Sequence, residues 1–209
     1  MNSFVEKKFR QHLPVQSTQD MIIALAGRRI DAPGTNPGRF PLAHVESVKN
    51  KLVTWLRLAH ATQLVCSGAC GADLVALQAA DELGIIKTMI LPFDADTFRT
   101  TSVTDRPGNW GSMYDQFVTE LKRSNRVIEL NYDKNDVAAY LNTNLRILDQ
   151  AQRMAQSENE KDPHPGSPSK ITAVIVWEGK PKDADDSTYH FKTEAEKRNY
   201  PVTEILTDE

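Results

Sequence analysis

The stretch VCSGACGADLVALQAA, residues 65–80, places two glycines and an aspartate between a short apolar run and a run with helical spacing. The apolar run predicts a buried strand, and residues 72–84 predict a helix that Gly84 closes. A strand joined to a helix by a glycine turn is typical of proteins with a parallel sheet. Residues 68–73 are therefore either only a tight connection or a loop shaped to hold a phosphorylated ligand.

The rest of the chain repeats this alternation of short apolar runs and helical segments. Strands are expected at residues 21–27, 63–67, 85–93, 126–130, 171–179 and 201–206, and helices at 42–58, 72–84, 112–123, 136–156 and 187–199. The pattern predicts an α/β fold, a Rossmann-like three-layer sandwich whose mainly parallel sheet carries helices on both faces.

Three segments fall outside this alternation. Residues 1–20 predict a polar N-terminal arm before a single domain that covers residues 21–209. Residues 94–111 show no period, and a loop of that length inside a compact domain predicts a functional, mobile element. Residues 157–170 are polar and contain prolines, which predicts a mobile insert.

Composition narrows the classes of function. The 209 residues carry a net charge of −3, which argues against a protein that coats nucleic acid. We find neither an apolar run of about 20 residues nor a signal-peptide core, so a cytoplasmic protein without a membrane contact is expected. Cys66 and Cys70 are too close for a disulfide between strand and helix and too few for a metal site, so reduced thiols and no metal are expected.

In parallel α/β sheets, ligands bind beyond the carboxyl ends of the strands. The first two strands deliver Gly27, Arg28, Arg29 and Ser67 to that edge. Arg28 and Arg29 belong either to a solvated, charged turn or to a site in which one arginine clamps a phosphate with two hydrogen bonds. If Arg28 is the clamp, its loss should weaken a phosphorylated ligand more than the corresponding nucleoside.

The glycine loop itself allows two interpretations. Gly68 and Gly71 either form a tight turn or let a phosphate approach the free amides at the start of the next helix. In the second case, a side chain at Gly71 would block the ligand and leave the fold intact. Asp73, in the first helical turn, either complements the helix dipole or accepts hydroxyl protons from a ribose.

Further candidates follow the later strands. Asp94 is a possible ligand contact, and Arg99 and Arg106 either donate to a phosphate or belong to a polar lid without a ligand. Phe98 and Trp110 either stack on a base or anchor the packing. Ser187 and Thr188, at the start of a late helix, form either an N-cap or a second anion site.

Four segments together resemble the SLOG superfamily, Rossmann-like domains related to the LOG phosphoribohydrolases and to DprA. They read IALAGRRIDAPG, CSGACGADLVALQAADELGI, ILPFDADTFRTTSVTDRPGNWG and YLNTNLRILDQA, and the resemblance covers about residues 21–206. It implies a nucleotide-sugar site at Gly68, Gly71 and Asp73 and a second contact at Ser187 and Thr188. It also implies a homo-oligomer.

The chain departs from that family in two places. The turn DADDST lacks the family's glycines, and the PGGxGTxxE motif of the LOG enzymes is missing, so phosphoribohydrolase activity is not carried over. The expectation is a signalling or defence sensor that binds a nucleotide or an NAD-derived molecule such as ADP-ribose and needs no cofactor.

Two other functions remain open. An N-glycosidase would need a carboxylate at the anomeric carbon, with candidates Asp73, Asp94, Asp96 and Glu178. Binding of single-stranded DNA would use Arg28, Arg29, Arg57, Lys122 and Arg123, but the sequence has no aromatic ladder to support it.

Overall fold

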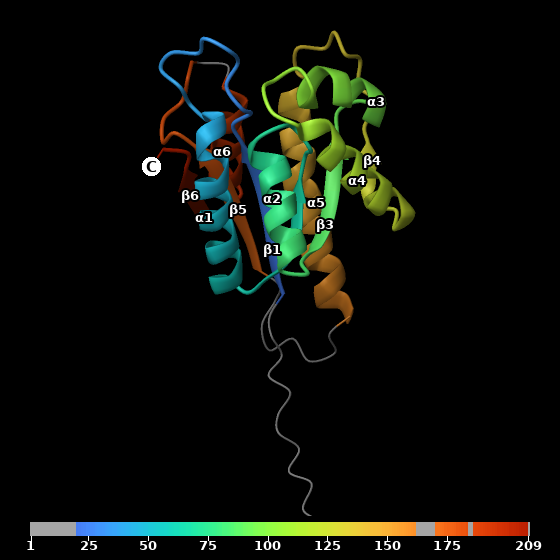
Figure 1. The fold of residues 1–209 in the computed structure, drawn as a ribbon. Helices are drawn as coiled ribbons and strands as arrows, with labels where there is room; N and C mark the ends of the chain where they lie inside the picture. The colour runs from blue at the N-terminus through green and yellow to red at the C-terminus, as the bar shows by residue number, and fades with distance from the viewer. Residues whose placement is uncertain (1–19, 162–169, 184–185, 209) are drawn as a thin grey trace, which may run out of the picture.

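The computed structural model describes residues 20–161, 170–183 and 186–208, which form one six-stranded sheet between two layers of helices (Figure 1). Every neighbouring pair of strands is parallel, and the strand order is β4-β3-β2-β1-β5-β6. The strands are β1 (Met21–Gly27), β2 (Ala61–Cys66), β3 (Ile86–Leu91), β4 (Val127–Glu129), β5 (Lys170–Trp177) and β6 (Val202–Leu206).

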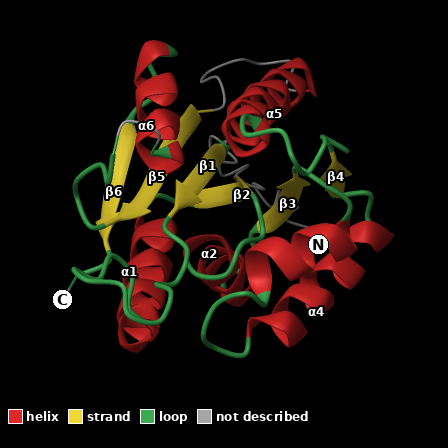
Figure 2. Cartoon of the chain, turned by 90° about the horizontal axis from the view of Figure 1, so that it is seen from above, coloured by secondary structure: helices red, strands yellow, loops and turns green. Residues whose placement is uncertain are grey.

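The helices divide between the two faces of the sheet, as the view from above shows (Figure 2). The 3-10 helix η1 (Leu42–His44) leads into α1 (Val45–Leu58), which covers one face together with α2 (Ala72–Glu82) and α4 (Trp110–Arg123). The other face is covered by α5 (Ala139–Lys161) and α6 (Ser187–Lys197). This confirms the predicted Rossmann-like α/β fold.

Burial on both faces explains why the central strand β1 is apolar without alternation. In β1, Ile23 and Leu25 pack under α1 and α2, whereas Ile22 and Ala24 pack under α5 and α6. All four side chains are fully buried. An unbroken apolar run in the sequence therefore marks a central strand here.

The prediction of an irregular loop at residues 94–111 is wrong for its first half. Residues 95–98 form the short helix α3 (Ala95–Phe98), which continues as a π-helical turn, η2 (Arg99–Val103). Ser102 and Val103 are fully buried, so this turn is part of the core rather than a free lid. Two elements of four and five residues are too short to show a period in the sequence.

The bounds of the expected insert at residues 157–170 are wrong at both ends. Residues 157–161 continue α5, and Lys170 already begins β5. Residues 162–169 and the expected arm at residues 1–19 lie outside the described part of the chain.

No helix of the described residues is long and apolar enough to cross a lipid bilayer.

The order of the strands reverses next to β1. The chain moves outward from β1 through β2 and β3 to β4, and α5 then returns it to β5 on the other side of β1. Connections leave β1 and β5 in opposite directions, which opens a crevice above their carboxyl ends. This edge lies at the top of Figure 1, away from the N-terminal end of β1.

Both cysteines are unpaired and buried, as expected from their spacing. Burial raises the pKa of the Cys66 thiol well above its usual value. Burial also raises the pKa of Cys70, although the neighbouring Arg29 partly opposes the shift. The two thiols therefore stay protonated and pack as small apolar side chains.

Candidate functional site

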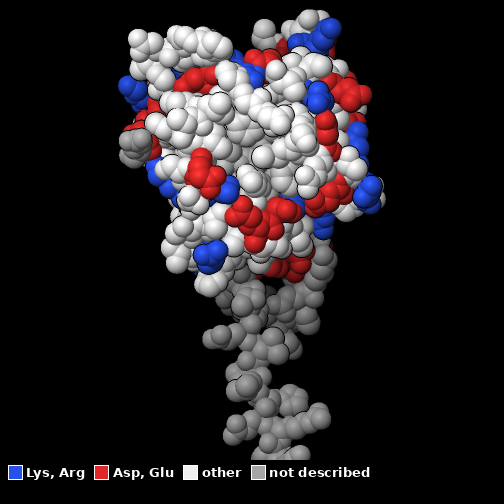
Figure 3. Space-filling model, viewed as in Figure 1, with Lys and Arg blue, Asp and Glu red and all other residues white. Residues whose placement is uncertain are grey.

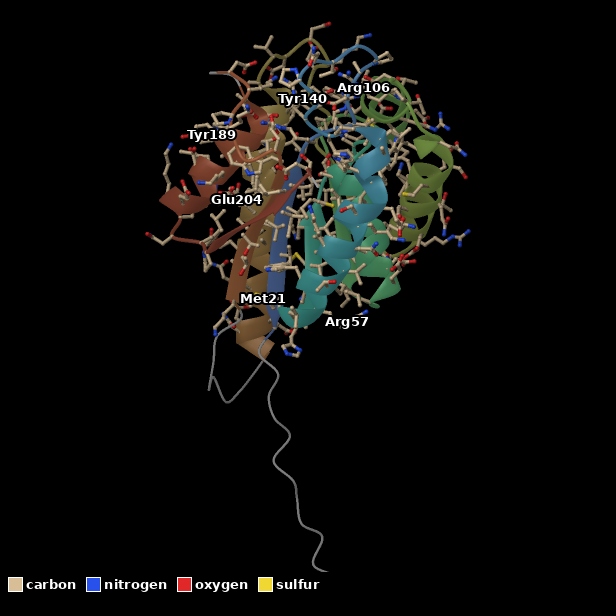
Figure 4. All side chains as sticks on the ribbon, turned by 60° about the vertical axis from the view of Figure 1, so that its left-hand side comes forward. Met21, Arg57, Arg106, Tyr140, Tyr189 and Glu204 are labelled. Atoms are coloured by element: carbon tan, nitrogen blue, oxygen red, sulfur yellow. The ribbon has the colours of Figure 1, made fainter. Side chains whose placement is uncertain are left out.

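Three adjoining cavities occupy the crevice at the carboxyl ends of β1 and β5, and Arg29 and Ser187 line all three. The basic chamber, about 230 Å³, is lined by Arg28, Arg29, Arg39, Arg106 and Lys182 together with Asp31. The middle chamber, about 80 Å³, contains Asp73 and Ser67, and the apolar chamber, about 640 Å³, contains Val137, Tyr140 and Leu141. Arg106 and Tyr140 lie at the same end of the molecule, opposite to Met21 (Figure 4).

The amides of the glycine loop are largely bonded within the protein. The Ala69 N–H donates to the carboxylate of Asp73, and the Cys70 N–H donates to the Ser102 carbonyl. At the start of α2, the Ala72 N–H donates to the Arg28 carbonyl at 3.0 Å. Donors occupied in this way are not available to a phosphate, so the loop supports the site more than it holds an anion.

Gly71 is required by the backbone that lies against it. Its φ of +102° is a conformation that L residues rarely adopt. A Cβ atom there would lie 2.7 Å from the Arg28 carbonyl oxygen and 2.8 Å from the Ile30 nitrogen. Gly68 has a similar packing role, because its Cβ would press on Met89 and Tyr114. Neither glycine lines a chamber of the crevice.

Arg28 is held by two carboxylates that come from a distant part of the sequence. Its Nε donates to Glu178 at 2.6 Å, and its Nη1 donates to Asp186 at 2.6 Å. Its Nη2 bonds Glu178 and the Lys180 carbonyl, and the guanidinium lies 5.8 Å from the centre of the Trp177 ring. With two carboxylates against its single charge and 7% of its surface exposed, Arg28 forms a structural ion cluster in the wall of the basic chamber.

Asp186 also closes the start of α6. Its Oδ1 accepts hydrogen bonds from the backbone amides of Thr188 and Tyr189, and its Oδ2 accepts one from Lys182. Asp186, rather than the predicted Ser187 or Thr188, is therefore the N-cap. This frees the Ser187 and Thr188 hydroxyls, which line the crevice and make no hydrogen bond within the described part of the chain.

Within the crevice, Arg29 and Arg106 each keep an Nε–H group without a hydrogen bond in the described part of the chain. Both side chains contact the carboxylate of Asp105, and the distance from Arg106 Nε to Asp105 Oδ2 is 3.6 Å. The Nε atoms of both arginines are buried, and among the described residues neither makes a hydrogen bond. Buried N–H groups in folded proteins are almost always bonded, so these two groups are candidate donors to a ligand.

Asp73 is buried beside the middle chamber, and burial raises its pKa to about 7. The hydrogen bond from the Ala69 amide and the charge of Arg29 oppose that shift without cancelling it. The carboxyl group therefore titrates near neutral pH, where its neutral form is populated. A neutral carboxyl group does not repel a phosphate, and it can donate a hydrogen bond to a ligand.

This raised pKa predicts a measurable effect of pH on stability. A folded-state pKa above the unfolded value of about 3.9 means that stability falls as the pH rises from about 4 to 7, by on the order of 4 kcal/mol. Asp73→Asn keeps the acceptor for the Ala69 amide and cannot ionise. We expect the variant to gain stability relative to the wild type between pH 4 and pH 8, in urea unfolding at each pH. A constant difference between the two proteins would contradict the raised pKa.

The structure brings together only some of the residues that the sequence singled out. Those that line the crevice are Gly27, Arg28, Arg29, Ser67, Asp73, Phe98, Arg106, Ser187 and Thr188. Asp94 instead caps α3 by accepting the Thr97 amide, and Arg99 forms a bidentate pair with Asp115 of α4. Neither of these two side chains lines the crevice.

The two aromatic candidates serve mainly as packing anchors. Trp110 is 5% exposed and donates its indole N–H to the Pro107 carbonyl. Phe98 is 1% exposed and packs beside Tyr114, although one edge reaches the middle chamber. A base could not stack on either ring without first opening the core.

Several residues of the crevice were missed by the sequence reasoning. They are Arg39, Tyr140, Thr143, Asn144 and Lys182. Arg39 lies in the proline-rich loop after β1 and Tyr140 in the first turn of α5, and the position of each beyond a strand end was the only available signal.

The residues considered for DNA binding do not form a common groove. Arg28 is buried, Lys122 pairs with Glu129, and Arg57 lies at the opposite end of the molecule from Arg106 (Figure 4). Positive and negative side chains are interspersed across the face that carries α1, α2 and α4 (Figure 3).

Among the described residues, no group of three or more His, Cys, Asp or Glu side chains could hold a metal ion.

These features define the class of the protein: a Rossmann-like α/β protein with six parallel strands and a polar crevice at its topological switch point. No protein-family model matches the chain, and a comparison with curated proteins finds no similar sequence. The assignment therefore rests on strand order, connectivity and the position of the crevice.

Proposed function

We propose that the protein binds a phosphorylated small molecule, a nucleotide or an NAD-derived relative such as ADP-ribose, in the crevice above β1 and β5. The basic chamber takes the phosphate, and the Asp73 carboxyl with the Ser67 and Thr188 hydroxyls takes the sugar. By the resemblance to SLOG domains, the role is that of a sensor in bacterial signalling or defence.

The observation that carries this proposal is the pair of unbonded Nε–H groups on Arg29 and Arg106. Both arginines line the basic chamber, to which Arg39 and Lys182 add further positive charge. Guanidinium groups match phosphate oxygens in geometry as well as in charge. The phosphate contact is thus assigned to these side chains, because the glycine-loop amides are bonded elsewhere.

Asp105 fits the same proposal as an internal competitor for the phosphate. Its carboxylate contacts both Arg29 and Arg106 and provides a single negative charge. A phosphate dianion brings more charge and more acceptor oxygens, so it can displace Asp105 from the two arginines. The segment that holds Asp105 precedes α4, and its release upon binding would give the two states that a sensor needs.

Arg29→Gln should weaken a phosphorylated ligand about 10-fold to 100-fold, because it removes a charged hydrogen-bond donor from a partly buried site. The measurement is calorimetric titration with ADP-ribose and AMP, with adenosine as the ligand without phosphate. Adenosine affinity should be unchanged. Arg99→Gln is the matched control, since Arg99 is an arginine paired with a carboxylate outside the crevice. Equal losses for AMP and adenosine would exclude a phosphate contact at Arg29.

The raised pKa of Asp73 favours one alternative, an N-glycosidase that acts on a nucleotide. A carboxyl group that titrates near neutrality can transfer a proton in either direction during catalysis. Incubation with AMP, NAD and ADP-ribose, followed by chromatography for free base, separates the two functions. Turnover that Asp73→Asn abolishes would identify an enzyme, and intact ligand after long incubation would identify a binding protein.

A further inference from the structure

The apolar chamber beside the phosphate subsite contains an exposed aromatic ring that is held in place. Tyr140, in the first turn of α5, is 42% exposed, and Val137, which lies just before this helix, is 95% exposed. With Leu141 they line a cavity of about 640 Å³ that shares Arg29, Lys182 and Ser187 with the rest of the crevice. The chamber thus combines an exposed apolar surface with the cationic and hydroxyl side chains of the crevice, as ligand pockets commonly do.

Tyr140 is fixed from two sides. Its hydroxyl bonds the Ser102 Oγ at 2.9 Å, and its ring meets Phe93 edge to face, with ring centres 5.8 Å apart. Ser102 is itself fully buried in the π-helical turn, and its carbonyl accepts the Cys70 N–H of the glycine loop. The ring is therefore positioned before any ligand arrives, so binding would order few additional side-chain rotamers.

We infer that Tyr140, with Val137 and Leu141, forms a subsite for the planar heteroaromatic ring of the ligand whose phosphate is bound by Arg29 and Arg106. This inference rests on the proposed function, because the phosphate subsite decides which end of the ligand faces the apolar chamber. The three chambers adjoin one another, and their linings, cationic, carboxyl-containing and aromatic, suit the phosphate, the sugar and the base of a nucleotide.

The ring subsite has a defined chemistry. An exposed tyrosine face stacks on any flat base, and its neighbours Val137 and Leu141 provide no hydrogen-bonding side-chain groups to read the base edge. The subsite therefore adds affinity for a planar ring and little discrimination between adenine and guanine. Selectivity for the base, where it exists, would have to come from other contacts.

The experiment compares AMP with ribose 5-phosphate, which carries the same phosphate and sugar without a base. By calorimetric titration of the full chain, AMP should bind about 10-fold more tightly than ribose 5-phosphate, and GMP should bind about as tightly as AMP. Tyr140→Ala should reduce the affinity for AMP to that for ribose 5-phosphate. Tyr140→Phe keeps the ring and should retain most of the gain, which separates stacking from the hydroxyl bond to Ser102.

Tyr189→Ala is the matched control, because Tyr189 is 43% exposed and stacks on Trp177 without lining the crevice. Its affinity for AMP should equal that of the wild type. If ribose 5-phosphate binds and AMP binds no more tightly, the ring subsite is wrong and the phosphate site stands. If neither compound nor ADP-ribose binds, the proposed function fails together with this inference.

Discussion

Arg28→Met is expected to lower the free energy of unfolding by about 4 kcal/mol, because it leaves two carboxylates without their counter-ion. The Glu178 side chain is 11% exposed and the Asp186 side chain is fully buried, so water cannot replace the lost donors. Methionine fills a similar volume, which limits the contribution of a cavity. Urea unfolding at pH 7 measures the loss.

The matched control is Arg99→Met. Arg99 makes a bidentate pair with Asp115 of similar geometry, but the two side chains are 37% and 52% exposed. Exposed pairs contribute less than about 1 kcal/mol, so the control should be nearly as stable as the wild type. Similar losses in the two variants would show that the Arg28 cluster is not a buried ion cluster at all.

The dependence on pH distinguishes loss of charge pairing from a packing defect. Burial alone would raise the pKa of Asp186, but hydrogen bonds from Arg28 and from the Lys182 and Tyr189 amides outweigh it and lower the pKa. A lowered pKa gives stability that is present above about pH 4 and lost as the pH falls through the folded value. The gap between the wild type and Arg28→Met should therefore narrow below pH 4.

Gly71→Ala is expected to destabilise the fold by about 3 kcal/mol, since the new Cβ would need an unfavourable φ and would clash with backbone atoms of residues 28–30. The clashing atoms belong to the backbone that follows β1. This backbone cannot move without breaking the hydrogen bond from the Ala72 N–H to the Arg28 carbonyl. The expectation from sequence, that a side chain here blocks a ligand and leaves the fold intact, does not hold for this geometry. Thermal and urea unfolding both report the effect.

Gly84 provides the control for Gly71. It also has a positive φ, of +66°, but a Cβ there would meet no atom within 4 Å. Gly84→Ala should therefore cost only about 1 kcal/mol, the conformational part alone. Losses of equal size at the two glycines would mean that contact with residues 28–30 does not constrain the loop.

Most of the fold was predictable because its signals are local. The run MIIALAG marks β1, and the short apolar run at residues 64–66 marks the end of β2, because each run is bounded by glycine or polar residues. The wrong secondary-structure predictions occur where the local pattern is weak or fits both a helix and a loop. Residues 95–103 form two elements too short to be periodic, and the polar end of α5 at residues 157–161 looks like a loop.

The position of the candidate site was predictable from the sequence, but which side chains point into it was not. The rule that ligands bind beyond strand ends brought Arg29, Ser67, Asp73 and Thr188 to one crevice, where the structure places them. The same rule also selected Asp94 and Arg99, which follow β3 but turn away to cap α3 and to pair with Asp115. Position along the chain does not fix the direction of a side chain in a connecting segment.

The sequence alone determined the layered architecture, because burial of both sheet faces requires apolar runs in the strands and apolar residues at helical spacing in the helices. Tertiary structure alone decided which polar groups are available at the sheet edge. Arg28 and Arg29 are identical neighbours in the sequence, yet Glu178 and Asp186 neutralise the first and leave the second facing the crevice. Those partners are 150 and 158 residues away, and electrostatic pairing at that separation depends on the folded geometry rather than on local pattern.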